Sequence, residues 1–185
     1  MKFLETPLSG CFVIEPEPVS DDRGFFARTF AAGDFERLGL DPAVIESSVS
    51  YNTRRGTVRG LHLQAAPYGE TKLVRCTRGR ILDVAVDLRP DSPTHLQWTS
   101  AELTADNRRS LYLPKQFAHG FMTIEDDTEV VYQMSSPYVA EAASGLRWDD
   151  PVLAIAWPDA GTITISARDR AWPLLDRSDV SDRAR

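Results

Sequence analysis

The sequence contains few cysteines and no long hydrophobic run. Cys11 and Cys76 are its only cysteines among 185 residues, and neither lies in a CxxC or Cys/His cluster. This spacing argues against a disulfide framework or a zinc finger and predicts two buried thiols. No apolar stretch reaches the roughly 18 residues that a membrane span needs, and the first residues lack a signal peptide's apolar stretch. We therefore expect a cytoplasmic protein with no membrane partner.

Positive charge is also scarce. The chain has 21 Lys and Arg residues against 27 Asp and Glu, giving a formal net charge of -6. This balance argues against a nucleic-acid partner. Only three of the basic residues are lysines, and Lys72 stands inside an apolar segment. A compact ammonium at that place can serve chemistry that a guanidinium cannot, although chance alone could leave three lysines.

Prolines and glycines divide the chain into short segments, most of which alternate with period two or carry β-branched and aromatic residues. We expect strands at residues 11–15, 24–30, 46–52, 57–64, 71–77, 80–88, 95–104, 109–113, 119–124, 128–136 and 162–166. Only residues 33–38 predict a helix. This pattern favours an all-β antiparallel sandwich or jelly roll over a βαβ fold. We expect one domain over residues 1–175 and a loose polar tail at 176–185.

His62 lies on a short apolar strand, residues 59–64. Alternation places it on the same side as Val58 and Gln64, unless a bulge at Gly60 changes the parity. An imidazole in this position is either a base that works near neutral pH or a core histidine satisfied by a neighbour. The surrounding residues decide between these interpretations.

Two further strands carry inward polar groups. Lys72 falls on the side of Val74, and Tyr132 on the side of Val130. An ammonium, an imidazole and a phenol are each costly to bury without partners or water, so together they indicate a cavity. His119 adds a second histidine at a strand entrance.

A metal centre is the first kind of site to test. Jelly-roll metal sites commonly use a His-x-His pair on one strand and a third histidine from another. Here the residue two positions after His62 is Gln64, and His95 follows a turn sequence. With only His62 and His119 available, acid–base chemistry without a metal is the favoured alternative.

Several motifs in order resemble the dTDP-4-dehydrorhamnose 3,5-epimerase family. They are Asp22-Arg23-Gly24-Phe25-Phe26, Arg59-Gly60-Leu61-His62, Lys72-Leu73-Val74-Arg75-Cys76, Asp83-Val84-Ala85-Val86-Asp87, Ser92-Pro93-Thr94, Phe117-Ala118-His119-Gly120-Phe121, Trp148 with Asp150-Pro151, and Ser166-Ala167-Arg168-Asp169. The resemblance implies a cupin-type jelly roll with short peripheral helices. It also implies a homodimer that acts on a nucleotide-diphosphate 4-keto-6-deoxy sugar without a metal or cofactor.

The resemblance implies four catalytic residues. His62 is similar to the base that abstracts a proton, and Asp169 to the carboxylate that orients it. Tyr132 resembles the proton donor on the opposite face of the sugar, and Lys72 the group that stabilises the enolate. The hydrogens at C3 and C5 are both α to the C4 ketone, so removing either one gives an enolate that a nearby cation stabilises.

The resemblance also implies substrate-binding residues: Arg23, Phe26, Arg59, His119, Tyr138 and Arg168. Of these, Arg23 and Arg59 resemble diphosphate ligands, His119 lies near the phosphates or the sugar, and Tyr138 takes the place of the aromatic that stacks on the base.

The departures from the family pattern fall where the nucleotide binds. Arg28 stands for the usual Glu, Ser47-Ser48-Val49 for a Gln-x-Asn segment, Ala143 for a second Glu, and Arg168 for a Lys. Lost amide and carboxylate groups remove hydrogen bonds to the base or sugar. The nucleotide specificity therefore stays open, and so does the pathway, which could serve an antibiotic or a surface glycan in place of rhamnose synthesis. Further alternatives are an enzyme that inverts only C3 or only C5, a ketoisomerase, a non-catalytic sugar-nucleotide binding relative, and a metal-dependent oxygenase.

Overall fold

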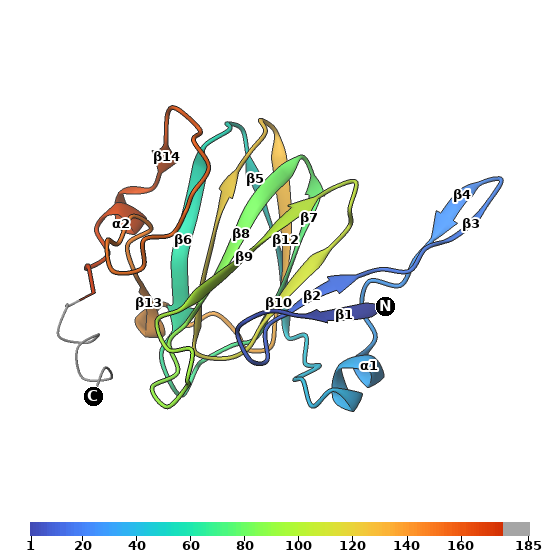
Figure 1. The fold of residues 1–185 in the computed structure, drawn as a ribbon, viewed down its shortest axis with the longest axis horizontal. Helices are drawn as coiled ribbons and strands as arrows, with labels where there is room; N and C mark the ends of the chain where they lie inside the picture. Colours follow the sequence, from blue (N-terminus) through green and yellow to red (C-terminus); the bar gives the residue numbers. More distant parts are fainter. Residues whose placement is uncertain (176–185) are drawn as a thin grey trace.

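The computed structural model describes residues 1–175 and contains two facing β-sheets (Figure 1). The first sheet has the order β1 (Lys2–Glu5), β2 (Phe12–Glu15), β10 (Ser110–Leu113), β7 (Lys72–Arg78), β12 (Thr128–Met134) and β5 (Glu46–Asn52). The second has the order β13 (Ala143–Gly145), β6 (Thr57–Gln64), β11 (Phe117–Thr123), β8 (Arg80–Asp87) and β9 (Trp98–Thr104). A short strand, β14 (Thr164–Ile165), runs parallel to β6, and all other pairs are antiparallel.

The remaining elements are peripheral. A separate hairpin consists of β3 (Val19–Asp21) and β4 (Gly24–Phe26). The helices are α1 (Ala32–Arg37), the 3-10 turn η1 (Ala140–Ala142) and α2 (Ala167–Arg170). Within residues 1–175, none of them is long and apolar enough to cross a membrane. The predicted tail at 176–185 lies outside the described residues.

The strand predictions were most accurate where alternation is regular. Strands β5 and β6 have the predicted bounds, and the predicted jelly-roll class is confirmed. The prediction at residues 24–30 was wrong beyond Phe26, because the chain leaves its hairpin partner there and has no other strand to pair with. Strands β1, β3 and β13 were missed, since segments of three or four residues carry little periodicity.

Apolar side chains from both sheets fill the space between them. This central cluster includes Val74 and Cys76 of β7, Val130 of β12, and Ile81 and Ala85 of β8, all at most 1% exposed. Lys72 and Tyr132 share their strand faces with these residues, as alternation predicted. The predicted buried thiols are also confirmed, because both cysteines are free and buried.

Two further clusters cover the outer faces. Helix α1 places Phe35 against Ile14, Leu73 and Tyr112 of the first sheet. The segment after β13 packs against the outside of the second sheet, with Leu153 among its buried residues. Each of the two sheets is therefore packed on its outer face as well as against the other sheet.

A bulge in β6 corrects the predicted orientation of one residue. Arg59 pairs with Phe121 and His62 pairs with His119, so the register shifts by one residue between them. Gly60 takes a φ of 135°, and a Cβ atom there would lie 2.5 Å from Gly120 Cα. His62 therefore faces inward with Gln64, but Val58 faces the opposite side.

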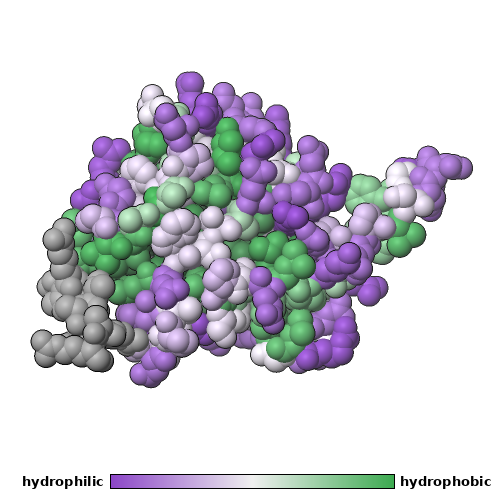
Figure 2. All heavy atoms as spheres, in the orientation of Figure 1, coloured by the Kyte–Doolittle hydropathy of each residue, from purple (hydrophilic) through white to green (hydrophobic). Residues whose placement is uncertain are grey.

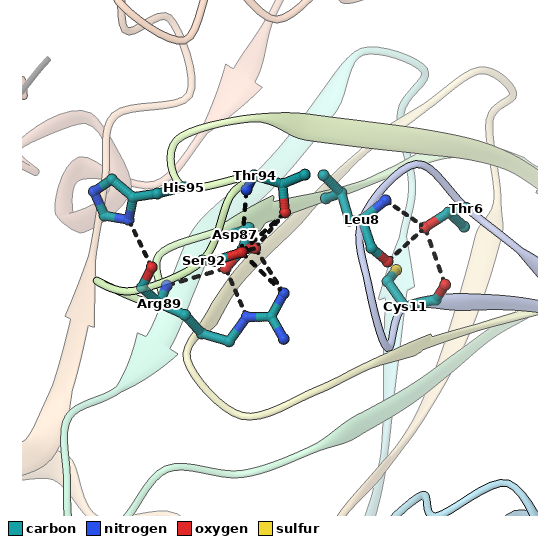
Figure 3. Close-up of polar contacts among 8 residues, drawn as sticks. All are labelled: Thr6, Leu8, Cys11, Asp87, Arg89, Ser92, Thr94 and His95. Atoms are coloured by element: carbon teal, nitrogen blue, oxygen red, sulfur yellow. Dashed lines mark hydrogen bonds and ion pairs between the residues drawn. The ribbon is translucent and has the colours of Figure 1, made fainter. Parts of the chain in front are cut away.

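A polar network fixes the loop after β8 (Figure 3). Asp87 accepts hydrogen bonds from the Arg89 guanidinium and from the hydroxyls of Ser92 and Thr94. Burial opposes ionisation of this carboxyl, but these hydrogen bonds prevail and hold the pKa of Asp87 below its usual range. His95 lies in the same turn, with Nδ1 3.0 Å from the Arg89 carbonyl oxygen. The Ser92-Pro93-Thr94 motif thus has a structural role here.

Candidate active site

A cavity of about 330 Å³ opens between the two sheets. Five of the predicted catalytic and substrate-binding residues line it: His62, Lys72, Tyr132, Tyr138 and Arg168. They come from β6, β7, β12, the segment before β13, and α2. The fold therefore gathers onto one cavity groups that lie more than a hundred residues apart in the chain.

His62 and Asp169 form a hydrogen-bonded pair at the cavity wall. His62 Nε2 lies 2.7 Å from Asp169 Oδ1, and the Gly60 N–H donates to Asp169 Oδ2 at 3.3 Å. The side chain of His62 is 42% exposed, whereas that of Asp169 is 7% exposed. Burial opposes ionisation of Asp169, but the hydrogen bond and charge of His62 prevail and lower its pKa. An ionised Asp169 leaves Nδ1 as the nitrogen of His62 that can accept a proton.

Helix α2 positions Asp169. Ser166 caps this helix, and its Oγ accepts a hydrogen bond from the Asp169 N–H at 3.0 Å. Strand β14 precedes the cap and pairs in parallel with β6. The Asp169 carboxylate is thus anchored, through α2 and β14, to the strand that carries His62.

Tyr132 faces the cavity from the first sheet. Its hydroxyl lies 3.2 Å from Ser50 Oγ on β5. Burial raises the pKa of Tyr132, and the Ser50 hydrogen bond only partly offsets this effect. The phenol therefore stays protonated over the whole neutral range and is available as a proton donor.

Lys72 is held by a carboxylate that the sequence did not single out. Its Nζ forms an ion pair with Glu70 Oε1, and the side chains of Lys72 and Glu70 are 12% and 7% exposed. Both line the cavity. The signal in the sequence was the i, i+2 spacing of two charged residues at the start of an apolar strand.

His119 lies behind Tyr132 and does not line the cavity as described. Its Nε2 lies 2.7 Å from Asp83 Oδ1, and its ring meets that of Tyr132 edge to face at 6.1 Å. Both His119 and Asp83 are buried, at 4% and 0% exposed. Burial raises the pKa of Asp83, although His119 opposes this shift. Asp83 lies in one of the motifs that resemble the family, but its hydrogen bond with His119 was not predicted.

Three of the predicted substrate ligands lie on or near α2. The Arg168 guanidinium donates to the Tyr138 hydroxyl at 3.3 Å across the cavity rim. Arg59 lies in an adjoining hollow that His62, Arg168 and Asp169 also line. Its Nε donates to Asn52 Oδ1 at 2.7 Å.

Arg23 and Phe26 are not brought to this cavity. The β3–β4 hairpin that carries them projects from one side of the molecule, while β6 and α2 lie on the other (Figure 1). The Arg23 side chain is 90% exposed and is bound to Asp21 of its own hairpin. Figure 2 shows hydrophobic surface on this hairpin, where Phe26 is 73% exposed.

Only some of the residues that depart from the family pattern line the cavity. On β5, Glu46 and Ser48 line the cavity, whereas Val49 is 62% exposed. Strand alternation thus turns Ser47 and Val49 away and brings in Glu46, which was missed. Ala143 also lines the cavity, whereas Arg28 is exposed on the segment after the hairpin.

The described residues contain no group of three or more His, Cys, Asp or Glu side chains arranged to hold a metal ion. The two histidines closest to the cavity each have a carboxylate on Nε2 instead. The arrangement offers a base with its orienting carboxylate, an ammonium and a protonated phenol, which are the parts of a proton-transfer site.

Comparison with known proteins agrees with this arrangement. The family model described as dTDP-4-dehydrorhamnose 3,5-epimerase matches residues 5–177. A dTDP-4-dehydrorhamnose 3,5-epimerase from Sinorhizobium fredii is 42% identical over 98% of this chain and 93% of its own length.

Solved structures give the same result. The epimerase from Bacillus anthracis, crystallised with TDP and PPi, is 44% identical with a TM-score of 0.90, covering 94% of this chain and 99% of that one. A 3'-monoepimerase from Streptomyces bikiniensis in complex with dTDP-quinovose is 34% identical with a TM-score of 0.85, covering 91% and 85%. The chain therefore belongs to the dTDP-4-dehydrorhamnose 3,5-epimerase family.

Proposed function

We propose that this protein inverts C3, C5 or both in a dTDP-linked 4-keto-6-deoxyhexose by acid–base catalysis. The observation that carries the proposal is the placement of the His62–Asp169 pair on the same cavity as Lys72 and Tyr132. A protein that only bound the sugar nucleotide would not need a base, an ammonium and a protonated phenol around one space.

The proposed reaction proceeds through an enolate. His62 takes the proton from C3 or C5, the electron pair of the broken C–H bond forms a double bond to C4, and the π pair of the C4 carbonyl moves to its oxygen. The Lys72 ammonium stabilises that developing oxyanion, and a donor of this kind is typically worth about 3–4 kcal/mol. Tyr132 then returns a proton to carbon from the opposite face, and exchange with water restores both His62 and Tyr132.

We assign the nucleotide to the rim beside Tyr138 and Arg168, with the diphosphate toward Arg59. These residues surround the hollows on both sides of His62. His119 would act from behind Tyr132, by holding that ring rather than by direct contact with the sugar. This is a change from the role that the resemblance implied.

We further propose a cytoplasmic homodimer in which residues 1–175 form one domain. If Arg23 and Phe26 bind substrate, they must do so in the cavity of a second copy, because their own hairpin points away from the cavity of the same chain. The exposed apolar side chains of the hairpin, Val19 at 73% and Phe26 at 73%, support such a contact. Sedimentation velocity would test the dimer, and a monomer at micromolar concentration would contradict it.

The function is tested by NMR of dTDP-4-keto-6-deoxyglucose with the enzyme in D₂O. Deuterium entering at C3 and C5 supports a 3,5-epimerase, and entry at one position identifies an enzyme that acts on a single centre. A carbonyl carbon that changes position indicates a ketoisomerase. No exchange with this or other nucleotide sugars indicates a binding protein, and stoichiometric iron or manganese in the purified protein would contradict the metal-free mechanism.

A further inference from the structure

Gln64 is nearly buried and uses its whole amide group on neighbouring main chain. It is 7% exposed, and its Nε2 donates to the carbonyl oxygens of Tyr68 and Pro137, each at 3.1 Å. Its Oε1 accepts from the Val139 N–H at 2.6 Å. Pro137 and Val139 are the two residues that flank Tyr138, so one side chain fixes the peptide groups on both sides of this tyrosine.

Tyr138 lies on a segment that crosses between the sheets. This segment, residues 135–142, leaves the first sheet after β12 and enters the second sheet at β13. The Tyr138 N–H also donates to Glu46 Oε1 at 3.3 Å, and its hydroxyl accepts from Arg168 at 3.3 Å. Tyr138 nevertheless remains 58% exposed, so packing alone does not hold the ring in place.

Gln64 lies on the strand that carries the proposed base. It is two residues from His62 on β6, on the same face, and both line the cavity. Its three hydrogen bonds therefore fix the rim of the nucleotide site relative to the catalytic strand. An aromatic ring that is already ordered before binding loses little further conformational freedom when the ligand binds.

We propose that Gln64 is a positioning residue that holds Tyr138 in place for the nucleotide. This inference rests on the proposed function, in which the nucleotide lies beside Tyr138, and on the base-stacking role that the resemblance implies for this tyrosine. The polar residue that replaces a second histidine on β6 is thereby assigned to substrate affinity and not to the chemical step.

The test uses Gln64→Met in the full chain, which keeps the length of the side chain, adds no charge and removes all three hydrogen bonds. Calorimetry should show that dTDP alone binds about tenfold more weakly. The rate of deuterium exchange at saturating nucleotide sugar should stay within about twofold of the wild type, because the reacting groups are unchanged. The matched control is Gln97→Met, at an exposed position outside the cavity, which should bind dTDP like the wild type.

A double-mutant cycle separates positioning of Tyr138 from a general structural role. Tyr138→Ala should weaken dTDP binding, and adding Gln64→Met to it should cause no further loss. An equal loss in both backgrounds would overturn the inference, and so would unchanged dTDP affinity in Gln64→Met. If Gln64→Met does not fold, Gln64→Asn, whose shorter amide cannot span the same partners, replaces it in the same cycle.

The same experiments test the proposed function separately from the role of Gln64. Unchanged dTDP binding in Tyr138→Ala would overturn both the inference and the base-stacking assignment. Deuterium exchange by the wild type tests the epimerase chemistry independently of either variant.

Discussion

Two histidine–carboxylate pairs stand next to each other in this protein, and they differ in exposure. His62 and His119 are directly paired between β6 and β11, and each has its Nε2 2.7 Å from an aspartate oxygen. His62 is half-exposed on the cavity, whereas His119 and Asp83 are buried. The same two residue types thus occur in an open pair and in a closed pair.

The surroundings set opposite pKa directions for the two carboxyls. Burial raises the pKa of Asp83, because His119 only partly compensates for lost hydration. Asp169 is also desolvated, but His62 and the Gly60 N–H together lower its pKa. A short hydrogen bond to histidine therefore does not distinguish the two pairs; their burial and their access to the cavity do.

The largest expected difference is in catalysis. His62→Ala should lower deuterium exchange at C3 and C5 by about 10³-fold or more, because it removes the proposed base. NMR in D₂O measures this directly. His95→Ala, in a turn outside the cavity, is the control and should exchange like the wild type. Substantial exchange by His62→Ala would remove His62 as the base.

For stability we expect the reverse order, with a larger loss when the buried pair is broken than when the open pair is broken. Asp83→Ala leaves a buried imidazole without its partner, and we expect it to lower the free energy of unfolding by about 3–5 kcal/mol. Asp169→Ala should cost only about 1–2 kcal/mol, since His62 can be hydrated. Urea unfolding of both variants measures the difference. Equal losses would mean that the two pairs are not distinguished by burial.

Tyr132 connects the two pairs, since it packs against His119 and faces the cavity that His62 lines. Tyr132→Phe removes the hydroxyl of the proposed proton donor but keeps the ring. We expect the epimerised product to form about 10²-fold more slowly, while deuterium exchange at the carbon next to the proposed base falls less. If exchange and epimerisation fall equally, Tyr132 is not specifically the acid.

The smallest effect is a change in the pH dependence of stability. The lowered pKa of Asp169 contributes stability above the unfolded value of about 3.9, and this is lost as the pH falls below it. The raised pKa of Asp83 has the opposite sign: ionisation costs stability as the pH rises above about 3.9.

Unfolding measured between pH 3 and pH 6 should therefore separate two variants. Asp169→Asn should flatten the loss of stability at the acid end, and Asp83→Asn should steepen the rise of stability above about pH 4, each by at most about 1.4 kcal/mol per pH unit. Parallel curves for the two variants would contradict the opposite pKa directions.

Much of the fold was predictable because period-two alternation is local. It gave the bounds of β5 and β6 and the inward faces of Lys72 and Tyr132. It failed at Val58, because the bulge depends on how closely Gly60 approaches Gly120 of β11, a contact between distant segments.

The site was only partly predictable for a similar reason. An aspartate in the apolar strand β8 was a visible signal, but nothing local identified His119 as the partner of Asp83. Likewise, Gln64 could be recognised as a missing metal ligand, whereas its hydrogen bonds to Tyr68, Pro137 and Val139 depend on loops that the sequence does not place.

The projecting β3–β4 hairpin leads us to expect complementation between two mutant chains. If each hairpin completes the site of a second copy, an Arg23→Ala chain and a His62→Ala chain damage different halves of a site. In a mixed dimer both lesions fall in one site, and the other site is whole. Two inactive alleles would then complement each other, and random pairing would restore about a quarter of wild-type activity.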